Sequence, residues 1–460
     1  MKTKILTLCA LLALAVAPAA AQGIYEASLA TENSIVRVWQ ERDVVIYNEE
    51  STGVGSFLLY TVGTGTAQHI DLPVDISVRD FEIMDEEVWF CGEKTDNSYP
   101  GGRAGVVGTF NIPNTFGGAT PINYAVMDSW FRLPPLVMYI HGLEQLDLFW
   151  LGNNLIMAMT GDCYIHQAIT RKRSTVVSAM FNGTQWGVYA LKDIDSTAVF
   201  TDIAALDNVV TAVGTSVDGT GLIAKSFYKS ISFPNWPITP SFGDSIVCSS
   251  PIGKALITHL SDDEAAVVQL DEKGRTLLHM LDFATGSAVP MAPTRITDDP
   301  NHPYDPEWDL KEIRYSSTTE NISVLEYGVL PGSNAFETLL WTFPRWAWGP
   351  AVPVQPMTIV KQESMDVDID NRPVTVGKVI GSGNLDVQSY AVYTGQYSPI
   401  MAPLLEWDNC TDYEEIDYSG ELPTVPLIPV NDYGEYDYFY NLEHQPEVTK
   451  IEFTNICREP

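Results

Sequence analysis

A short motif recurs along this chain at intervals close to 55 residues, and this recurrence limits the folds open to the chain more than any other feature. Three copies are clear: DFEIMDEEVWFCG from Asp80, DIAALDNVVTAVG from Asp202 and DVDIDNRPVTVG from Asp366. Each has an aspartate, an acidic turn, an apolar run and a glycine. A fourth copy, DLFWLGNNLIMAM from Asp147, keeps the aspartate and the turn but lacks the glycine. Self-similarity at a fixed period indicates a repeat architecture.

Weaker copies begin near Ile35, Ile257 and Glu312, which brings the number of copies to seven. From Asp147 onward the starting points are separated by 55, 55, 55 and 54 residues. The two intervals that flank Asp80 are less even, at 45 and 67 residues. We therefore expect seven units of similar length, with any irregularity close to Asp80.

Each unit contains four short runs that are typical of β-strands. The third run ends in an aromatic residue and a turn, as in GVVGTFNIPN, and a fourth apolar stretch follows. The runs are rich in β-branched and aromatic residues and are bounded by Gly, Asn, Asp and Pro. Four strands per unit at this period predict propeller blades, which stack because one blade cannot bury both of its faces. The prediction is an all-β, seven-bladed β-propeller of four-stranded blades over residues 22–400, with a C-terminal extension.

The layout of these strands resembles that of WD40-like and kelch-like propellers. The chain lacks the GH…WD signature of the first and the double glycine of the second. The resemblance therefore implies an architecture and carries no functional residue across.

The two ends of the chain differ in composition from the repeats. Residues 1–21 combine Lys2 and Lys4 with an apolar run and end in Ala-Ala-Ala, which predicts a signal peptide cleaved before Gln22. Such an ending is typical of a Gram-negative bacterium, so we expect export to the periplasm or the medium. Cys9 lies inside the apolar run and does not follow a lipoprotein pattern. Residues 401–460 are acidic and tyrosine-rich, and we expect them to pack on the propeller, with a final strand that helps to close the ring.

Charge and cysteine content exclude several classes of partner. The chain has 26 basic and 59 acidic residues, a formal net charge of −33. Such a chain repels nucleic acid and anionic lipid, and no stretch after the signal has the length of a membrane span. The mature cysteines are odd in number, without CxxC or metal-ligand spacing, so we expect no metal and no cofactor. Cys410 and Cys457 are the pair we expect to form a disulfide, whereas Cys91 and Cys248 lie in strand-like runs typical of a core.

One motif suggests an enzyme and is better explained by the repeat. Gly243-Asp244-Ser245-Ile246 resembles the nucleophile block of the GDSL hydrolase family, which implies an esterase with an α/β fold and a late Asp-x-x-His. In this chain Ser245 falls where a unit needs its fourth strand. The Asp299–His302 stretch matches the Asp-x-x-His pattern but follows Ser245 too closely for that fold. A catalytic triad is in any case defined by geometry rather than by a sequence pattern. We interpret Ser245 as a structural residue.

Two sets of residues are candidates for ligand binding. The first lies in the connection from Asp162 to Arg173, between the second and third strands of its unit, and consists of Tyr164, His166, Arg171 and Arg173. An equally long connection, from Lys94 to Ala104, lies in the preceding unit. The second set, on third-to-fourth connections, consists of Trp236, Trp346 and Trp348.

Each set also has a structural explanation. The tryptophans can pack between blades, and the basic run can pair with neighbouring acids. The two sets belong to opposite faces, since second-to-third and third-to-fourth connections open at opposite ends of a blade. We favour the face with the long connections because long loops on a rigid scaffold often carry function.

The sequence leaves two functions open. The first is an exported binding or scaffolding module that recognises a protein or a glycan through one face of the propeller. The second is a carbohydrate-active enzyme, either a glycoside hydrolase or a polysaccharide lyase, with carboxylates around the central funnel. Carboxylates, Tyr and His that converge at one mouth would favour the enzyme. A flat aromatic face or a uniformly acidic face would favour binding.

Overall fold

The computed structural model describes most of the chain between residues 30 and 389. The described residues are 30–40, 43–50, 54–61, 66–114, 120–128, 131–133, 136–151, 154–165, 168–181, 183–184, 186–195, 198–206, 209–216, 222–228, 239–240, 251–261, 263–271, 276–282, 287–290, 309–329, 336–345, 352–354, 360–369, 373–379 and 385–389. The predicted signal peptide, Ser245, Cys248, Cys410, Cys457 and the C-terminal extension lie outside them.

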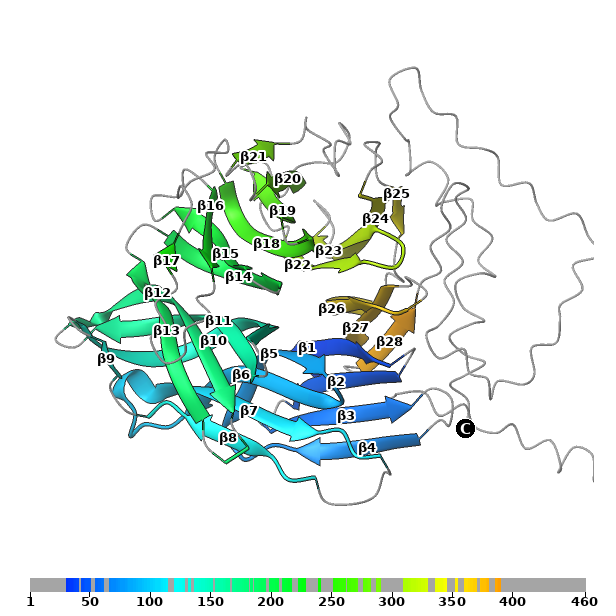
Figure 1. Ribbon diagram of the computed structural model, residues 1–460. Coiled ribbons are helices and arrows are strands. Elements are labelled where there is room, and N and C mark those ends of the chain that lie inside the picture. Colours follow the sequence, from blue (N-terminus) through cyan, green and yellow to red (C-terminus); the bar gives the residue numbers. More distant parts are fainter. Residues whose placement is uncertain are drawn as a thin grey trace, which may run out of the picture.

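The described residues form seven antiparallel sheets arranged around one axis, each a blade of a β-propeller (Figure 1). The innermost strands are β1 (Ala30–Trp39), β5 (Ile76–Met84), β10 (Leu136–Leu151), β14 (Ala198–Leu206), β18 (Pro251–Ser261), β22 (Asp309–Ser316) and β26 (Val360–Val367). The second strands are β2 (Asp43–Glu50), β6 (Glu87–Thr95), β11 (Asn154–Ile165), β15 (Val209–Ser216), β19 (Glu264–Asp271), β23 (Asn321–Val329) and β27 (Pro373–Val379). We number the blades 1 to 7 in this order.

The outer strands complete the blades. The third strands are β3 (Gly55–Thr61), β7 (Arg103–Asn111), β12 (Ala168–Phe181), β16 (Leu222–Tyr228), β20 (Thr276–Asp282), β24 (Phe336–Pro344) and β28 (Leu385–Ser389). The fourth strands are β4 (Thr66–Asp71), β8 (Asn123–Val126), β13 (Trp186–Asp195), β17 (Thr239–Pro240), β21 (Ser287–Pro290) and β25 (Val352–Val354). A further strand, β9 (Phe131–Leu133), pairs with β10, and a short 3-10 helix, η1 (Pro100–Gly102), precedes β7.

The prediction of an all-β propeller is confirmed, and the described residues form seven sheets. Each of the seven starting points of the motif lies in an innermost strand, one in every blade. Two blades differ from the expected four strands in the part of the chain that the structure describes: blade 3 has five strands and blade 7 has three. Blade 3 also has the longest strand, β10, which with β9 accounts for the long interval after Asp80.

The glycine of the motif has a steric cause. In β5, β14 and β26 a β-bulge shifts the register of the innermost strand, and Gly92, Gly214 and Gly377 lie opposite. A Cβ atom on these glycines would lie 2.0, 1.9 and 2.3 Å from a backbone carbonyl oxygen of the bulged strand. No side chain fits there, so the repeat keeps glycine where the bulge brings two backbones together.

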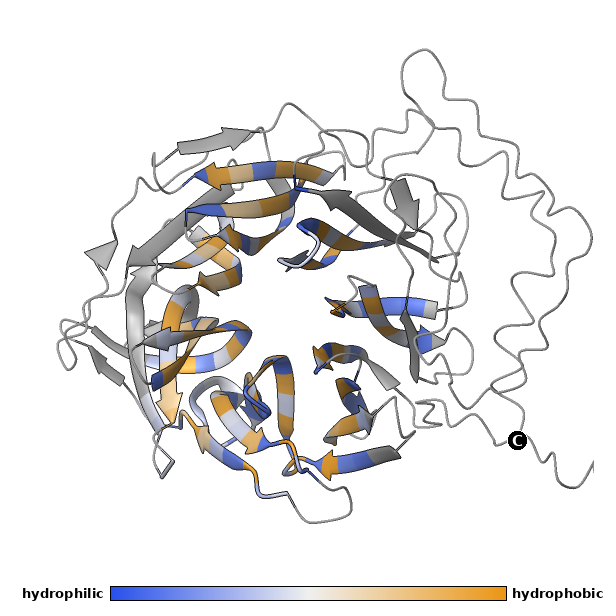
Figure 2. Ribbon diagram, turned by 45° about the vertical axis from the view of Figure 1, so that its right-hand side comes forward, coloured by the Kyte–Doolittle hydropathy of each residue, from blue (hydrophilic) through white to orange (hydrophobic). Residues whose placement is uncertain are grey.

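The blades pack on one another through alternating apolar residues, which form separate clusters at the seams between blades (Figure 2). Between blades 1 and 2, Phe57 has Tyr47, Phe81, Phe90 and Phe110 around it at ring-centroid distances of 5.1–5.7 Å. Cys91 is fully buried in the next seam, as expected for a core residue. Each seam buries one face of each of two sheets, which is the source of stability in a repeat ring.

The ring closes by contact between its first and last innermost strands. The backbone N–H groups of Val36 and Val38 in β1 donate to the side chains of Ser364 and Asp366 in β26, at 3.4 and 2.7 Å. Val374 and Val376 of β27 pack against apolar residues of blade 1. No helix among the described residues is long and apolar enough to cross a membrane.

Candidate functional site

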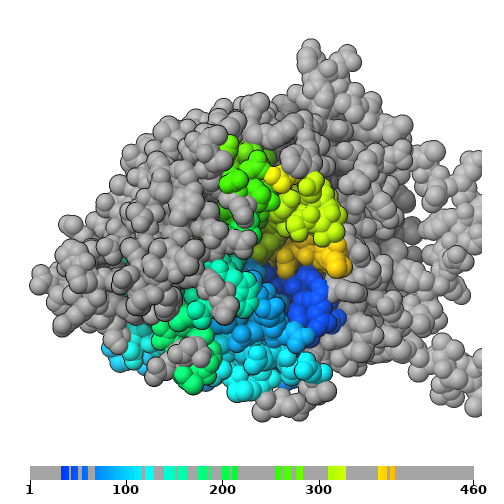
Figure 3. All heavy atoms as spheres, in the orientation of Figure 1, coloured from blue at the N-terminus to red at the C-terminus, as the bar shows by residue number. Residues whose placement is uncertain are grey.

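The two ends of the ring are distinguished by strand direction. Innermost strands begin at the end that carries the second-to-third connections, which we call the loop end. They finish at the end that carries the first-to-second hairpin turns, which we call the turn end. In the orientation of Figure 1 the described blades surround a hollow at the centre of the ring (Figure 3).

The aspartates of the motif hold neighbouring blades together. One carboxylate oxygen of Asp80, Asp147, Asp202 and Asp366 accepts from the backbone N–H of the following residue, at 2.7–2.9 Å. The other accepts, at 2.7–2.9 Å, from an N–H in the innermost strand of the next blade. These N–H donors belong to Leu146, Ala205, Ile257 and Val38. The aspartate therefore recurs because innermost strands have an open edge whose N–H groups need acceptors.

The four aspartates occupy two positions in their strands. Asp80 and Asp202 directly follow the bulge, whereas Asp147 and Asp366 lie two residues beyond the residue that follows it. The motif treats all four aspartates as equivalent positions of the repeat. In the structure, Asp147 and Asp366 lie two residues further along their strands than Asp80 and Asp202 do. Both positions point to the same neighbouring strand because side chains in a strand alternate with a period of two.

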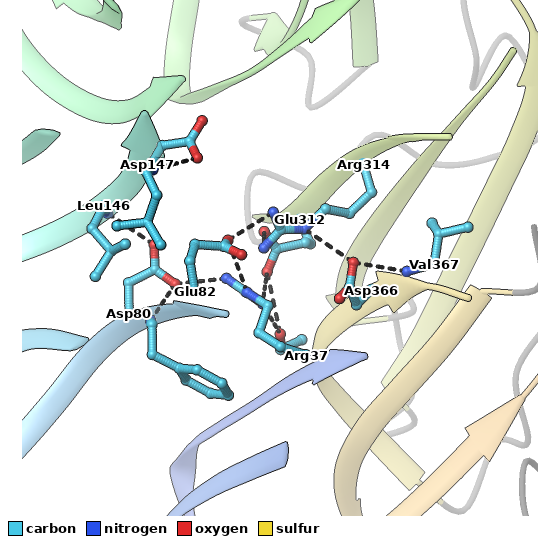
Figure 4. A network of polar contacts seen from close by, with 12 residues as sticks. Arg37, Asp80, Glu82, Leu146, Asp147, Glu312, Arg314, Asp366 and Val367 are labelled. Carbon is cyan, nitrogen blue, oxygen red and sulfur yellow. Dashed lines mark hydrogen bonds and ion pairs between the residues drawn. The ribbon is translucent and has the colours of Figure 1, made fainter. Parts of the chain in front are cut away.

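An ionic network joins blades 1, 2, 6 and 7 at the axis (Figure 4), where Asp366 of β26 lies 3.8 Å from Arg314 of β22. Arg37 of β1 contacts Asp80 and Glu82 of β5 at 2.6 and 2.9 Å. It also lies 3.5 Å from Glu312 of β22. Arg314 of β22 contacts Glu82 at 2.8 Å and Glu312 at 3.2 Å. Each glutamate thus bridges both arginines, and the four side chains form a closed ring of alternating charge.

This network spans the axis rather than one seam. Blades 6 and 2 are not neighbours in the ring, yet Arg314 and Glu82 meet at 2.8 Å. Arg37 is almost fully buried, with 2% of its side chain exposed, whereas Glu82, Glu312 and Arg314 keep 17–22%. The network is therefore partly open to solvent and can meet a ligand that enters the ring.

Burial and ion pairing move the pKa values of these carboxyls in opposite directions. Burial raises the pKa of Asp80, Asp147 and Asp202 to about 7, because a charged carboxylate loses its hydration inside the ring. Glu82 is buried as well, but Arg314 and Arg37 outweigh that effect and hold its pKa below the usual value. Near neutral pH the axis therefore carries carboxyls in both protonation states.

The turn end collects the acidic turns of the repeat. Its described acidic side chains are those of Asp43, Asp85, Glu86, Glu87, Asp263, Glu264, Asp282, Glu320 and Asp368. Apart from the two axial arginines, Arg345 is the basic side chain that the described residues place at this end, and it contacts Glu264. Because the hairpin turns of successive blades stand side by side, this end is strongly negative.

The loop end mixes both signs of charge. Arg79 and Arg103 each donate to one oxygen of the buried Glu93 carboxylate, at 2.8 Å. Beneath them His141 places Nε2 3.3 Å from Arg103 Nε and 3.2 Å from the carbonyl oxygen of Gly101. Burial lowers the pKa of His141, so its ring is neutral at pH 7. The long connection expected at Lys94–Ala104 is present in shorter form, since β6 runs to Thr95 and β7 starts at Arg103.

The second long connection was predicted wrongly. Asp162–Arg173 is mostly strand: β11 runs to Ile165 and β12 begins at Ala168. Tyr164 lies opposite Lys172, and Cys163 opposite Arg173, in the register of these strands. Polar composition suggested a loop, but backbone pairing with β11 extends the strand through the basic run. Tyr164, Arg171 and Arg173 therefore lie on a projecting hairpin of blade 3.

The remaining predicted site residues lie outside the described part of the chain. They are His166, Trp236, Trp346 and Trp348. For these residues the predictions stay predictions, as does the structural role of Ser245. Among the described residues no group of three or more His, Cys, Asp or Glu side chains could hold a metal ion.

Sequence reasoning missed the axial network. Arg37 and Arg314 belong to weak copies of the motif, which lack the aspartate that marks the clear copies. The available signal was that Arg37, Glu82, Asp147, Arg314 and Asp366 occupy corresponding places in their strands. Finding it required the bulges to be located first, because each bulge shifts the register of its strand.

The comparisons with known proteins show the fold alone. No family model matches the chain, and no curated protein sequence is significantly similar to it. Among solved structures, a periplasmic gluconolactonase from Pseudomonas aeruginosa is 9% identical, with a TM-score of 0.51, over 80% of this chain and 95% of that chain. A lectin from Burkholderia pseudomallei is 12% identical, with a TM-score of 0.48, over 81% and 99%.

A prolyl endopeptidase structure is 11% identical, with a TM-score of 0.45, and the match covers 84% of this chain. The chain spans about half the length of that protein and of a puromycin hydrolase, at 52% and 55%. The class defined by the seven sheets and by the match to the gluconolactonase is the β-propeller.

Proposed function

We propose that this chain is an exported binding module that recognises a protein or a glycan through one end of its propeller. The observation that carries the proposal is the sorting of charge between the two ends. The turn end gathers acidic turns from several blades, and most of the described basic side chains stand at the loop end or the axis. Two ends of distinct chemistry on a rigid ring suit recognition, since loops and turns on a scaffold can vary without disturbing it.

A second observation supports binding over catalysis. The carboxyls of Asp80, Asp147, Asp202 and Asp366 each accept two backbone N–H groups, so they already have a structural role. We place the ligand at the loop end. There the hairpin that carries Tyr164, Arg171 and Arg173 stands in blade 3, next to blade 2 with its connection that ends in η1.

The experiment is a screen of the mature chain against glycans and candidate protein partners, with two double variants. We expect Arg171→Ala/Arg173→Ala to weaken binding and Trp236→Ala/Trp346→Ala to leave it unchanged. Thermal unfolding of both variants serves as the control for folding. Loss of binding in the tryptophan variant alone, with folding intact, would move the site to the turn end. A mature chain that binds no ligand of either class would remove the proposal.

A carbohydrate-active enzyme is the second candidate, and the axial pKa values favour it. Asp147 and Asp80, with pKa values raised to about 7, can stay protonated, while Glu82 is ionised. Carboxyls whose pKa values are pushed apart are what acid and base catalysis of glycoside cleavage requires. Release of reducing ends from a polysaccharide by the wild type, abolished in a folded Glu82→Gln variant, would establish this function.

A further inference from the structure

Three lysines come together at the loop end of blades 6 and 7. Lys311 of β22 and Lys361 of β26 place their Nζ atoms 3.3 and 3.2 Å from the two carboxylate oxygens of Glu363. Lys378 of β27 lies directly opposite Lys361 in the register of the sheet. Lys311 also lies 3.3 Å from Asp309. Two ammonium groups therefore contact two carboxylates, and a third lysine lies on the neighbouring strand, in a chain whose net charge is −33.

One part of this arrangement opposes folding. Like charges on directly opposite residues of adjacent strands destabilise a sheet, and Lys361 and Lys378 form such a pair. Glu363 is 5% exposed, and burial raises its pKa although the lysines act against the shift. A pair of like charges that does not help the sheet is a candidate for recognition.

The two ammonium groups are held in place before any ligand arrives. Lys311 and Lys361 both lie over the ring of Tyr327, at 5.2 and 4.8 Å from its centroid. Their side chains are 18% and 15% exposed, so they are recessed but reachable. Contact with one carboxylate and one ring restricts both side chains, which lowers the entropy that binding would cost. Each ammonium has three N–H donors, so a ligand carboxylate would share these groups with Glu363 and, at Lys311, with Asp309.

We propose that Lys311 and Lys361, with Lys378 beside them, form a subsite for the carboxylate of an acidic glycan. Glu363 already shows that one carboxylate can bridge the two ammonium groups, and a uronate carboxylate has the same chemistry. A slender sugar chain reaches recessed lysines more easily than the broad surface of a folded protein does. The proposal rests on the proposed binding function and names the ligand class for the loop end.

The test compares oligogalacturonate with its methyl ester, which has the same backbone without the charge. Isothermal titration of the mature chain should show binding of the acid and little binding of the ester. Lys361→Gln or Lys311→Gln should weaken binding about tenfold, or about 1.4 kcal/mol, since each removes one hydrogen bond to a charged group. Lys361→Arg should retain most of it. Lys254→Gln, a change at the same end but in blade 5, is the matched control and should have no effect.

The outcomes are distinguishable. Equal binding of acid and ester, or binding that Lys311→Gln and Lys361→Gln do not change, would refute the subsite. Poly-L-glutamate that binds in place of oligogalacturonate would assign the subsite to acidic peptides, and heparin in its place would assign it to sulfated sugars; both results contradict the uronate. If a neutral glycan or a protein binds and no acidic polymer does, the subsite fails while the binding function stands. If nothing binds, the binding function fails too.

Discussion

At the scale of single residues, one aspartate in each of blades 2, 3, 4 and 7 joins its innermost strand to that of the next blade by a hydrogen bond. Asp202 illustrates it: its two oxygens accept from Ile203 in its own strand and from Ile257 in the next blade, both at 2.8 Å. The residue is 8% exposed, and its position is set by the bulge that precedes it. The motif therefore recurs for structural reasons, and its conspicuous aspartates are poor guides to function.

Replacing Asp202 with alanine should leave two buried N–H groups without an acceptor. Each unsatisfied buried group costs about 1–3 kcal/mol, so we expect Asp202→Ala to lower the free energy of unfolding by several kcal/mol in urea. Asp263→Ala, in an exposed turn, is the control and should change it by less than about 0.5 kcal/mol. Equal effects of the two changes would contradict the role of Asp202 in joining the two strands.

The same aspartates predict how stability depends on pH. The pKa of Asp202 is about 7 in the folded chain and near the ordinary aspartate value of 3.8 in the unfolded chain. The folded state therefore binds the proton more tightly, so stability is greatest below pH 4 for this group and is lost as pH rises toward 7. The slope reaches about 1.4 kcal/mol per pH unit for one group. Asp202→Asn removes the titration, so its unfolding free energy should fall less steeply between pH 5 and pH 7 than that of the wild type. Parallel curves would contradict the raised pKa.

At the scale of strands and turns, the sequence predicts the blades well and the hairpins less well. The spacing of the motif places all seven innermost strands, because a strand that must pack on two neighbours keeps its apolar pattern. Thr170–Arg173 was expected in a loop and lies in β12, since pairing with β11 outweighs the polar composition of the run. The axial arginines could not be predicted, because bulges set their register and a bulge leaves little trace in one sequence apart from the glycine opposite.

The glycine opposite each bulge provides a test at this scale. Gly214→Ala would place a Cβ 1.9 Å from the carbonyl oxygen of Val199, within backbone that two strands hold fixed. We expect a loss of more than about 3 kcal/mol, or no soluble protein, as for other severe overpacking. Gly102→Ala is the control, because nothing lies within 4 Å of its Cβ and only its positive φ of 80° opposes the change, at a cost of about 1 kcal/mol. Similar losses in unfolding experiments would show that packing at the bulge is not the cause.

At the scale of the whole molecule, the ring is held by neighbouring seams and by charges at its centre. Seams connect each blade only to the next, as in other repeat proteins. The ion pairs of Arg37 and Arg314 add contacts among blades 1, 2, 6 and 7, where the first and last parts of the ring meet. We infer that this network stabilises closure of the ring, which the described part of the chain achieves through β1 and β26.

Arg37→Met tests this role because it removes the charge and keeps much of the side-chain volume. Asp80 and Glu82 would then lose a buried partner, and breaking a buried ion pair costs about 3–5 kcal/mol. We expect a loss of this size in the free energy of unfolding, together with faster limited proteolysis at the junction of blades 1 and 7. A double-mutant cycle with Glu82→Gln should give a coupling energy of about 1 kcal/mol or more, since the two side chains are in contact. Arg345→Met, which removes an ion pair at the turn end, should leave the junction protected. If both arginine variants were equally sensitive at that junction, the axial charges would have no special part in closing the ring.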